Sequence, residues 1–420
     1  MLYDQNLAEK KSSKTSRINP PNTVLSTLTQ KRTSIWSPLS DFWTLGGLSI
    51  VLCLILHSAN FFREDLPVLQ MRFMQAMAVF SVLSIVCNHP HFLISYRFGY
   101  GRGINFIFKN WFALILVPLS LIVLYAIAYF KYDTNISESL YIEKLNSLLV
   151  YTGLSFRLGE TYKLGSEIMG LSIWFMYFTV GWHYCKQVYG CMMVYAFYDG
   201  YNLTSWQRLL LKSSVFSVAI YQFVYMAHAM EQYSVGGAIQ DQRFQGFYMT
   251  SIGLPDWMLV WSTVAMIILT IGGVAALVLK YRSSKQLPSL NFLVPWIAFY
   301  VWWVPISNLP EYYLLMVPFF HSLQYLPFAL RVENTKIKRN RWYSAQVSLR
   351  IMALLAVGLF AFELIPSVLD KKLETDVYQS AWFFATAFAV FLNIHHFFID
   401  SVVWKLKDKE VGSSLLYEVS

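Results

Sequence analysis

The chain holds eight histidines, and six of them lie in four separate apolar segments, where ionisable groups are costly and rare. Neutral imidazole is the commonest protein ligand for a metal ion. Helical bundles build metal sites from side chains that project inward from facing helices. We therefore predict a shared metal site with the ligands His91, His183, His321 and His395, and with His89 and His396 as alternates for the first and the last.

Three polar residues stand at helical spacing from these histidines. Gln187 follows the second predicted ligand by four residues, and Gln324 follows the third by three. Asp400 follows His396 by four residues and His395 by five. Polar groups beside a ligating imidazole fix its orientation and tautomer, and we predict this supporting role for all three. Asp400 could also ligate the metal directly, and ordinary hydrogen bonding between helices is the alternative for the two glutamines.

The residue types around these histidines narrow the kind of metal site. The four cysteines lack Cys-x-x-Cys spacing, which argues against a thiolate site. The histidine-bearing segments also lack the Glu-x-x-His pairs of carboxylate di-iron proteins. The His-x-x-x-His and His-x-x-His-His boxes typical of membrane desaturases are absent as well. One mononuclear ion held by about four imidazoles fits best, and such a site suits iron, copper or zinc.

The first two histidines surround a proline in the stretch CNHPHF. On a regular helix, His89 and His91 would point about 200° apart and could not share a site. Pro90 has no backbone N–H and is expected to interrupt the helix near its end, which would loosen this restriction. We predict His91 as the ligand and His89 as a supporting or alternative residue.

The segments that must position these residues are those of a membrane protein. Of the 420 residues, 56% are hydrophobic and 14% are charged, whereas soluble domains are roughly 45–50% apolar and about 25% charged. Helices are expected, because hydrocarbon leaves no partner for unpaired backbone groups. We predict an all-α polytopic transmembrane bundle of about ten spans, at 41–61, 70–96, 108–130, 167–198, 209–230, 257–280, 290–308, 311–330, 345–368 and 378–404.

Charged residues orient the predicted bundle. Lysine and arginine gather in every second loop, beginning with the N-terminal segment, and cytoplasmic loops are rich in these residues. Both termini are then cytoplasmic, and the six histidines fall in the cytoplasmic half of the membrane. Residues 1–40 are predicted to be a disordered basic tail, 41–406 a single transmembrane domain, and 407–420 a short second tail. The net charge of +9 follows from these loops, so it does not indicate nucleic-acid binding.

Four short motifs resemble, in order, those of the bacterial and archaeal β-carotene 15,15′-dioxygenases that supply retinal to rhodopsins, the Brp/Blh family. The motifs are NHPHFLISY with His91, WHYCKQ with His183, PFFHSLQYLPF with His321 and Ser322, and NIHHFFIDSVVW with His395 and Asp400. This chain departs from the family pattern at Ser95, at Gln187 and at the three residues after Ser322.

This resemblance implies a mononuclear non-haem Fe(II) that is bound by four histidines and cleaves a carotenoid with O₂. A lipophilic substrate and O₂ are the implied partners, and the inner membrane of a bacterium is the implied location. The chain's 17% aromatic content could line a tunnel for a long apolar molecule, although core packing explains aromatic residues as well.

Two other function classes stay open. One is a histidine-rich membrane metalloenzyme that modifies lipids, such as a desaturase, hydroxylase or decarboxylase. The other is a transporter, in which histidines would line a path through the whole membrane depth. The predicted single layer of histidines favours an enzyme. The sequence leaves the oligomeric state open.

Overall fold

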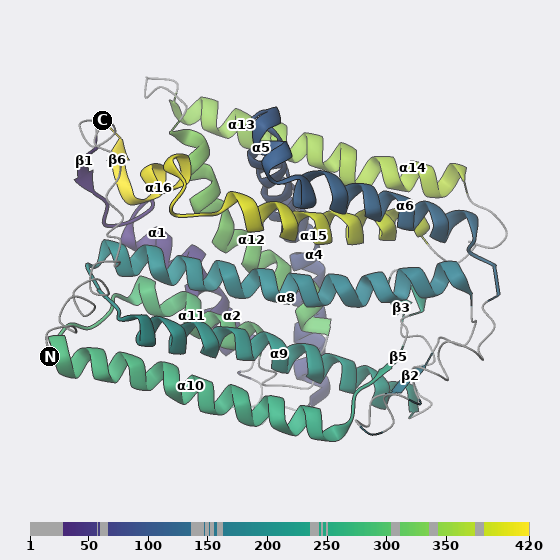
Figure 1. Cartoon of the computed structure of the whole chain (residues 1–420), viewed down its shortest axis with the longest axis horizontal. Helices are drawn as coiled ribbons and strands as arrows, with labels where there is room; N and C mark the ends of the chain where they lie inside the picture. The colour runs from purple at the N-terminus through teal and green to yellow at the C-terminus, as the bar shows by residue number, and fades with distance from the viewer. Residues whose placement is uncertain are drawn as a thin grey trace, which may run out of the picture.

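The computed structural model is a bundle of helices joined by loops, with short strand pairs between them (Figure 1). It describes residues 28–56, 58, 66–135, 147, 151, 155–157, 163–235, 243–244, 247–248, 251–303, 311–335, 343–373 and 382–419. The α-helices are α1 (Pro38–Phe42), α2 (Leu48–Leu56), α4 (Leu66–Tyr100), α5 (Ile104–Lys109), α6 (Val117–Phe130), α8 (Leu164–Tyr198), α9 (Ser205–Val235), α10 (Asp256–Ser284), α11 (Leu290–Trp303), α12 (Glu311–Asn334), α13 (Tyr343–Gly358), α14 (Ile365–Lys372), α15 (Phe383–Val403) and α16 (Lys409–Leu416).

Three π-helical turns connect α-helices into longer runs: η3 (Trp43–Gly47), η4 (Phe112–Leu116) and η6 (Leu359–Leu364). The strands are β1 (Leu28–Lys31), β2 (Ser155–Arg157), β3 (Arg243–Phe244), β4 (Phe247–Tyr248), β5 (Ser251–Gly253) and β6 (Tyr417–Val419). They pair as β1 with β6, β2 with β5 and β3 with β4, each antiparallel. The predicted all-helical class is therefore correct for the body of the molecule.

Each of the ten predicted spans overlaps a helix or a run of helices. In the described part of the chain, seven runs are long and apolar enough to cross a membrane: Pro38–Leu56, Ala78–Tyr100, Phe112–Phe130, Ser205–His228, Asp256–Ser284, Ala345–Lys372 and Phe383–Val403. The remaining three predicted spans correspond to α8, α11 and α12, and α11 has only 14 residues. Seven candidate spans are thus present, and the count of ten stays a prediction.

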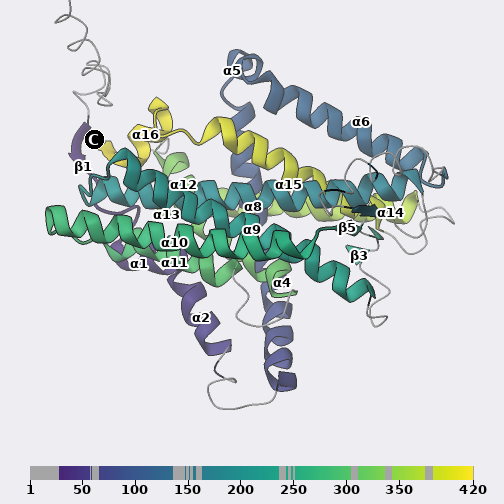
Figure 2. The ribbon, with the colours of Figure 1, turned by 60° about the horizontal axis from the view of Figure 1, so that its bottom comes forward.

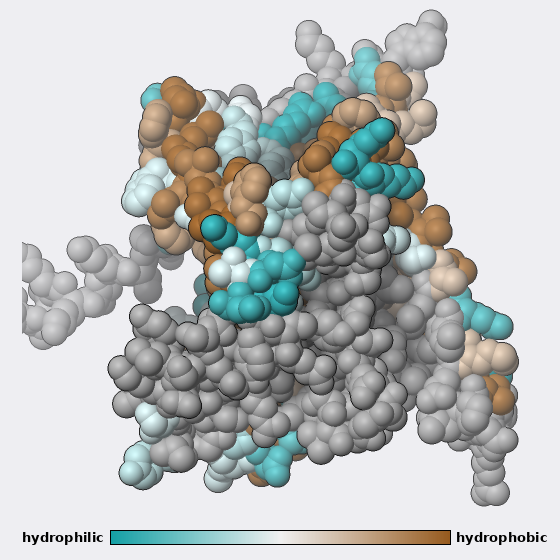
Figure 3. Space-filling view, turned by 90° about the vertical axis from the view of Figure 1, so that its right-hand side faces the viewer, coloured by the Kyte–Doolittle hydropathy of each residue, from teal (hydrophilic) through white to brown (hydrophobic). Residues whose placement is uncertain are grey.

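The outer helices expose long apolar surfaces. The helix α10 and the run from α13 to α14 form two opposite edges of the bundle in Figure 1. Only 17% of the apolar stretch in Asp256–Ser284 is buried, and only 11% of that in Ala345–Lys372. Brown patches also lie on the described part of the surface in Figure 3, among teal and white residues. Exposed apolar areas of this extent mark contact with a membrane or an apolar partner.

The helices that carry the histidines meet at the centre of the bundle. In Figures 1 and 2, α8, α9, α10 and α15 run in one general direction, and α4 crosses them steeply. The helix α4 packs against α12 and α15, while α8 packs against α9, α11 and α15. The crossing of α4 brings its second half against both α12 and α15, which are far away in the sequence.

Three described helices, α8, α10 and α15, run in the same direction, as the predicted alternation of loops requires, whereas α4 crosses them steeply. The C-terminal ends of α8, α10 and α15 lie at the left end of the bundle in Figure 1, together with α16. The N-terminal ends of the same three helices lie at the right end. Which of these ends faces the cytoplasm stays a prediction.

Residues 1–40 were predicted to be a disordered tail, but residues 28–40 contain strand β1 and the start of α1, and the short second tail contains α16 and β6. The strand β1 pairs with β6, so the two segments order each other. Just beyond β1, Asp41 is 1% exposed and accepts a 2.5 Å hydrogen bond from the Tyr195 hydroxyl. The composition of either tail gives no sign of this pairing, because each strand is stabilised by the other. Residues 1–27 lie outside the described residues.

The expected interruption at Pro90 does not occur. The helix α4 continues through Pro90 without a break. Proline removes one hydrogen bond from the helical ladder and usually kinks it, but here packing against α12 and α15 keeps the segment helical. His89 and His91 therefore point in different directions, as the geometry of a regular helix requires.

Candidate metal centre

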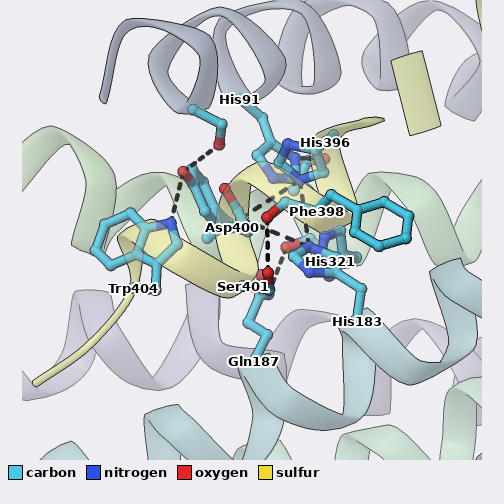
Figure 4. Close-up of polar contacts among 12 residues, drawn as sticks. His91, His183, Gln187, His321, His396, Phe398, Asp400, Ser401 and Trp404 are labelled. Atoms are coloured by element: carbon cyan, nitrogen blue, oxygen red, sulfur yellow. Dashed lines mark hydrogen bonds and ion pairs between the residues drawn. The ribbon is translucent and has the colours of Figure 1, made fainter. Parts of the chain in front are cut away.

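Four buried histidines from four helices converge on one point in Figure 4. They are His91 on α4, His183 on α8, His321 on α12 and His396 on α15, and one ring nitrogen from each lies within 4.8 Å of the others. Each is at most 6% exposed. The surrounding helices thus bury four imidazoles side by side.

A chain of hydrogen bonds sets the tautomer of His91. The Ser322 hydroxyl donates to the side-chain carbonyl of Asn88, so its oxygen is left to accept from Nδ1–H of His91 at 2.7 Å. The Nε2 atom of His91 then carries a lone pair, and it has no hydrogen-bond partner among the described residues. This is the orientation that a metal-ligating histidine needs.

His183 and His396 face each other across the centre. Their Nε2 atoms are 3.2 Å apart. Two nitrogens that each lie about 2.1 Å from one ion, at an angle of about 90–110°, are separated by about 3.0–3.4 Å. The observed separation fits two neighbouring ligands of one ion as well as a hydrogen bond between the two imidazoles, and one ligand atom from each of the four histidines lies within 4.8 Å of the others.

Asp400 lies beside this pair. Its Oδ2 atom is 3.5 Å from Nε2 of His396 and 3.8 Å from Nε2 of His183. Neither carboxylate oxygen has a hydrogen bond within the part of the chain that the structure describes, although the residue is only 6% exposed. A buried carboxylate without partners is costly. A cation between the imidazoles would offset that cost.

His321 gives the clearest sign of a missing partner. Both of its ring nitrogens are buried and lack a hydrogen bond within the described ranges. The ring of Tyr184 stacks on it, with the ring centroids 3.8 Å apart, and holds its plane. Buried polar atoms are nearly always bonded in native proteins. The nitrogen that faces the other three imidazoles is therefore available to an ion, so the donor set fits a metal.

The predicted fourth ligand, His395, does not join the cluster, and the alternate His396 takes its place. His395 is bonded on both nitrogens, to the Tyr96 hydroxyl at 2.9 Å and to the Tyr100 hydroxyl at 3.2 Å. Successive residues on a helix point about 100° apart, so only one of the pair can face the centre. The spacing to Asp400 was the available signal, because residues four apart share a helix face.

The other alternate, His89, also lies outside the cluster. Its Nδ1 atom is 2.9 Å from the carbonyl oxygen of Ile85, and its Nε2 atom is 3.2 Å from Oε1 of Glu363. The ring packs against Gly358, where an added Cβ would come within 2.5 Å of the His89 side chain. His89 thus connects α4 to the helix run of residues 343–372.

The two predicted glutamines form hydrogen bonds with backbone carbonyl groups and with each other. Gln187 donates to the carbonyl oxygen of His321 at 2.9 Å and to Oε1 of Gln324 at 3.0 Å. Gln324 donates to the carbonyl oxygen of Leu45 at 2.7 Å. Neither glutamine is hydrogen-bonded to an imidazole ring in the described structure. Their contacts are those of the predicted alternative, hydrogen bonding between helices, and they join α8, α12 and η3.

Two residues near the centre were not predicted as part of it. Asn88 fixes the Ser322 hydroxyl, and only its position next to the first histidine pair could have drawn attention to it. Tyr325 packs on the His91 ring with centroids 3.9 Å apart, and its hydroxyl bonds to Ser95 and to the indole of Trp404. These contacts depend on which helices cross, which local spacing does not indicate.

Two cavities flank the centre. The larger, of about 410 Å³, is bordered by Asn88, Phe92 and Tyr184, which lie against the imidazoles. Its other lining residues are mostly aromatic and aliphatic, such as Met176, Phe178, Trp182, Phe223, Met258 and Trp303. The smaller, of about 230 Å³, is lined by His183 and Asp400 themselves. One cavity is thus separated from the imidazoles by a layer of side chains, while the other reaches them directly.

The arrangement of four imidazoles, one carboxylate and two cavities is the basis on which function can be inferred. No protein-family model matches the chain, and neither a curated protein nor a solved structure matches it.

Proposed function

We propose that this protein is a multi-pass membrane metalloenzyme in which four histidines hold one non-haem iron that oxidises a long apolar substrate with O₂. The cleavage of a carotenoid of the β-carotene type is the reaction we favour. The observation that carries the proposal is the cluster of His91, His183, His321 and His396, which is buried, drawn from four helices and short of hydrogen-bond partners.

The membrane part of the proposal is supported by the outer helices. Few residues of their apolar stretches are buried, which is unfavourable in water and favourable in hydrocarbon. We propose about ten spans, because α8, α11 and α12 lie within the same bundle as the seven candidate spans. Both termini would face the cytoplasm of a bacterial inner membrane, with the histidine cluster in the cytoplasmic half.

Iron is the proposed metal because of the ligand set and the motif resemblance. Neutral imidazoles suit iron, copper and zinc, and the resemblance to the carotenoid dioxygenases favours Fe(II). Bound there, the ion would supply open positions for O₂ beside the substrate. The chain's own residues orient the imidazoles: Ser322 fixes the His91 tautomer, Tyr184 holds the plane of His321, and Asp400 adds negative charge beside His183 and His396.

The larger cavity is the proposed substrate site. It is apolar and lies against the cluster, as expected for a molecule that enters from the bilayer. Phe92 and Tyr184 stand between this cavity and the imidazoles, so they would position the chain of the substrate and exclude water from it. The same cavity would suit a fatty chain, so modification of a lipid is the second candidate.

Metal analysis of the purified full-length protein tests the centre, and the chain provides matched controls. His91→Ala and His396→Ala should lose at least 90% of the bound iron, on the order of a tenfold or greater loss of affinity. His89→Ala and His395→Ala remove imidazoles from the same two helices and should retain it. Full iron occupancy in both cluster variants would overturn the shared site.

Expression in bacterial cells that make β-carotene tests the substrate. Loss of orange colour together with formation of retinal is expected, and His321→Ala should abolish both. Cells that stay orange and contain no retinal, although the purified protein binds iron, would rule out this carotenoid. A changed fatty-chain profile in the same cells would then identify the second candidate.

A further inference from the structure

The smaller cavity is lined by charged side chains, which the larger cavity lacks in the described structure. Asp400 and Gln187 line this cavity. Both carboxylate oxygens of Asp400 and Oε1 of Gln187 are buried and have no hydrogen bond within the described ranges. Buried polar atoms of this kind are normally bonded to ordered water. A space of about 230 Å³ holds several water molecules, each of which takes up about 30 Å³ in the liquid.

A charged side chain also borders this cavity. Lys186 lies near the middle of α8, lines the cavity and is exposed, with its ammonium 4.9 Å above the Phe397 ring. Lysine in the middle of an apolar bundle is costly unless water reaches its charge. The cavity therefore extends between an exposed cation and the buried Asp400, and water in it would stabilise both.

The C-terminal segment closes one side of the cavity. Leu406, Val411 and Leu415 contribute to the lining, and the last two belong to α16. An ion pair between Arg102 and Asp408, at 2.9 Å, holds this segment to the end of α4. In Figure 1, α16 lies at the end of the bundle where α8 and α15 terminate. The cavity thus lies between the centre and that end of the molecule.

We propose that the smaller cavity is a water-filled chamber through which water reaches the histidine centre, apart from the apolar cavity. The purpose of this chamber rests on the proposed metal centre, but its water content does not. Lys186 gives the exposed side of the chamber a positive charge, and His183 and Asp400 form its inner wall.

Two glycines on α8 provide a matched pair of probes. Gly190 lines the smaller cavity, and no described atom lies within 4 Å of a Cβ built there. Gly181 lines the larger cavity, and a Cβ there would meet only Trp303 and Ala219, at 3.5 and 3.8 Å. A cysteine at either position should therefore fit and project into one cavity.

The test is thiol labelling of Gly190→Cys and Gly181→Cys in the full chain in lipid vesicles, followed by peptide mass spectrometry. A charged, water-soluble methanethiosulfonate reagent should react at Gly190→Cys at least tenfold faster than at Gly181→Cys. Neutral N-ethylmaleimide should react at both. Equal rates with the charged reagent would remove the contrast between the two cavities, and reaction of Gly190→Cys with the neutral reagent alone would mean that the smaller cavity is dry. Either result would overturn the proposal.

The unaltered chain gives a second test that does not depend on the folding of either variant. Cys191 lines the smaller cavity, whereas Cys185 on the same helix is fully buried and lies 3.4 Å from the carbonyl oxygen of Val215. The charged reagent should label Cys191 in preference to Cys185. Failure of this preference counts against the chamber, whereas failure of iron binding counts against the proposed function, so the two results are distinguishable.

Discussion

The two cavities beside the histidine cluster differ in what lies between them and the imidazoles. In the larger cavity, Phe92 and Tyr184 form that wall, so a molecule there touches rings before it meets a nitrogen. In the smaller cavity, His183 and Asp400 are the wall. A molecule in the larger cavity would contact these aromatic rings, whereas one in the smaller cavity would contact His183 and Asp400 themselves.

The two cavities also differ in the charge of their lining residues, and this difference would allow one centre to receive two kinds of molecule. The residues that line the larger cavity include no acidic or basic side chain in the described structure. The smaller cavity has Lys186 on one side and Asp400 on the other. Water prefers the charged space and a long apolar chain prefers the uncharged one. Polarity alone would then keep the two from competing for one route.

Filling the larger cavity should have the largest effect on turnover. In Gly181→Leu the side chain would occupy space that the proposed substrate needs, and retinal formation per bound iron should fall about 100-fold, since small misplacements of a substrate cost this much. Gly190→Leu fills the other cavity and should lower it by less. Retinal formation in β-carotene-producing cells, normalised to iron content, measures both. A larger loss in Gly190→Leu than in Gly181→Leu would mean that the substrate binds in the smaller cavity, and it would contradict the proposed substrate site.

Removing the carboxylate of the smaller cavity should weaken metal binding. Asp400→Asn keeps the side-chain size but removes the charge beside His183 and His396, and iron affinity should fall about 10–100-fold, as for other supporting residues of metal sites. Competition with a chelator measures it. Ser401→Ala is the matched control, because Ser401 lines the same cavity and donates to the carbonyl oxygen of Phe398. Equal affinities in the two variants would contradict a role for Asp400 at the metal.

The hydrogen bond between Ser322 and His91, on the side of the larger cavity, should contribute less to iron affinity than Asp400 does. Ser322→Ala removes the acceptor for Nδ1–H of His91 and should lower iron affinity about tenfold. The buried N–H left without a partner also costs about 1–3 kcal/mol of folding free energy. Ser95→Ala is the comparison, since its hydroxyl bonds to Tyr325 at 2.6 Å and touches no imidazole nitrogen. The same chelator competition checks the pair, and a stronger effect of Ser95→Ala would refute the proposed tautomer.

How much of this centre can be predicted from the sequence depends on how far apart the interacting residues lie along the chain. Three of the four clustered histidines were chosen from their polarity within apolar segments, because such residues are rare there. The choice between His395 and His396 failed because both lie in the same segment, and only the helical register to Asp400 separates them. Local spacing could have settled that choice.

Other features depend on contacts between distant segments, and no local pattern indicates them. The steep crossing of α4 brings Ser322 to Asn88 and His91, and nothing near Ser322 in the sequence shows that crossing. The pairing of β1 with β6 likewise joins the two ends of the described chain. The ten helical segments, in contrast, follow from runs of apolar residues, which is why each overlaps a helix.

The smallest effect should come from the lysine at the edge of the smaller cavity. Lys186→Met removes a positive charge from the space that Gly190→Cys probes. Labelling there by an anionic methanethiosulfonate should slow about threefold, and labelling by a cationic one should accelerate by a similar factor, because a nearby charge changes the local concentration of ions. Added salt should reduce both changes, since it screens charges in water.

The ratio of the two labelling rates in Lys186→Met separates this electrostatic effect from a structural one. A change in the shape of the cavity would slow both reagents alike and leave their ratio constant. A loss of charge alters the ratio and leaves the rate of neutral N-ethylmaleimide unchanged. Lys186→Arg keeps the charge and should keep the original ratio. An unchanged ratio in Lys186→Met would mean that anions do not pass this lysine, and the contrast between the two cavities would then rest on Asp400 alone.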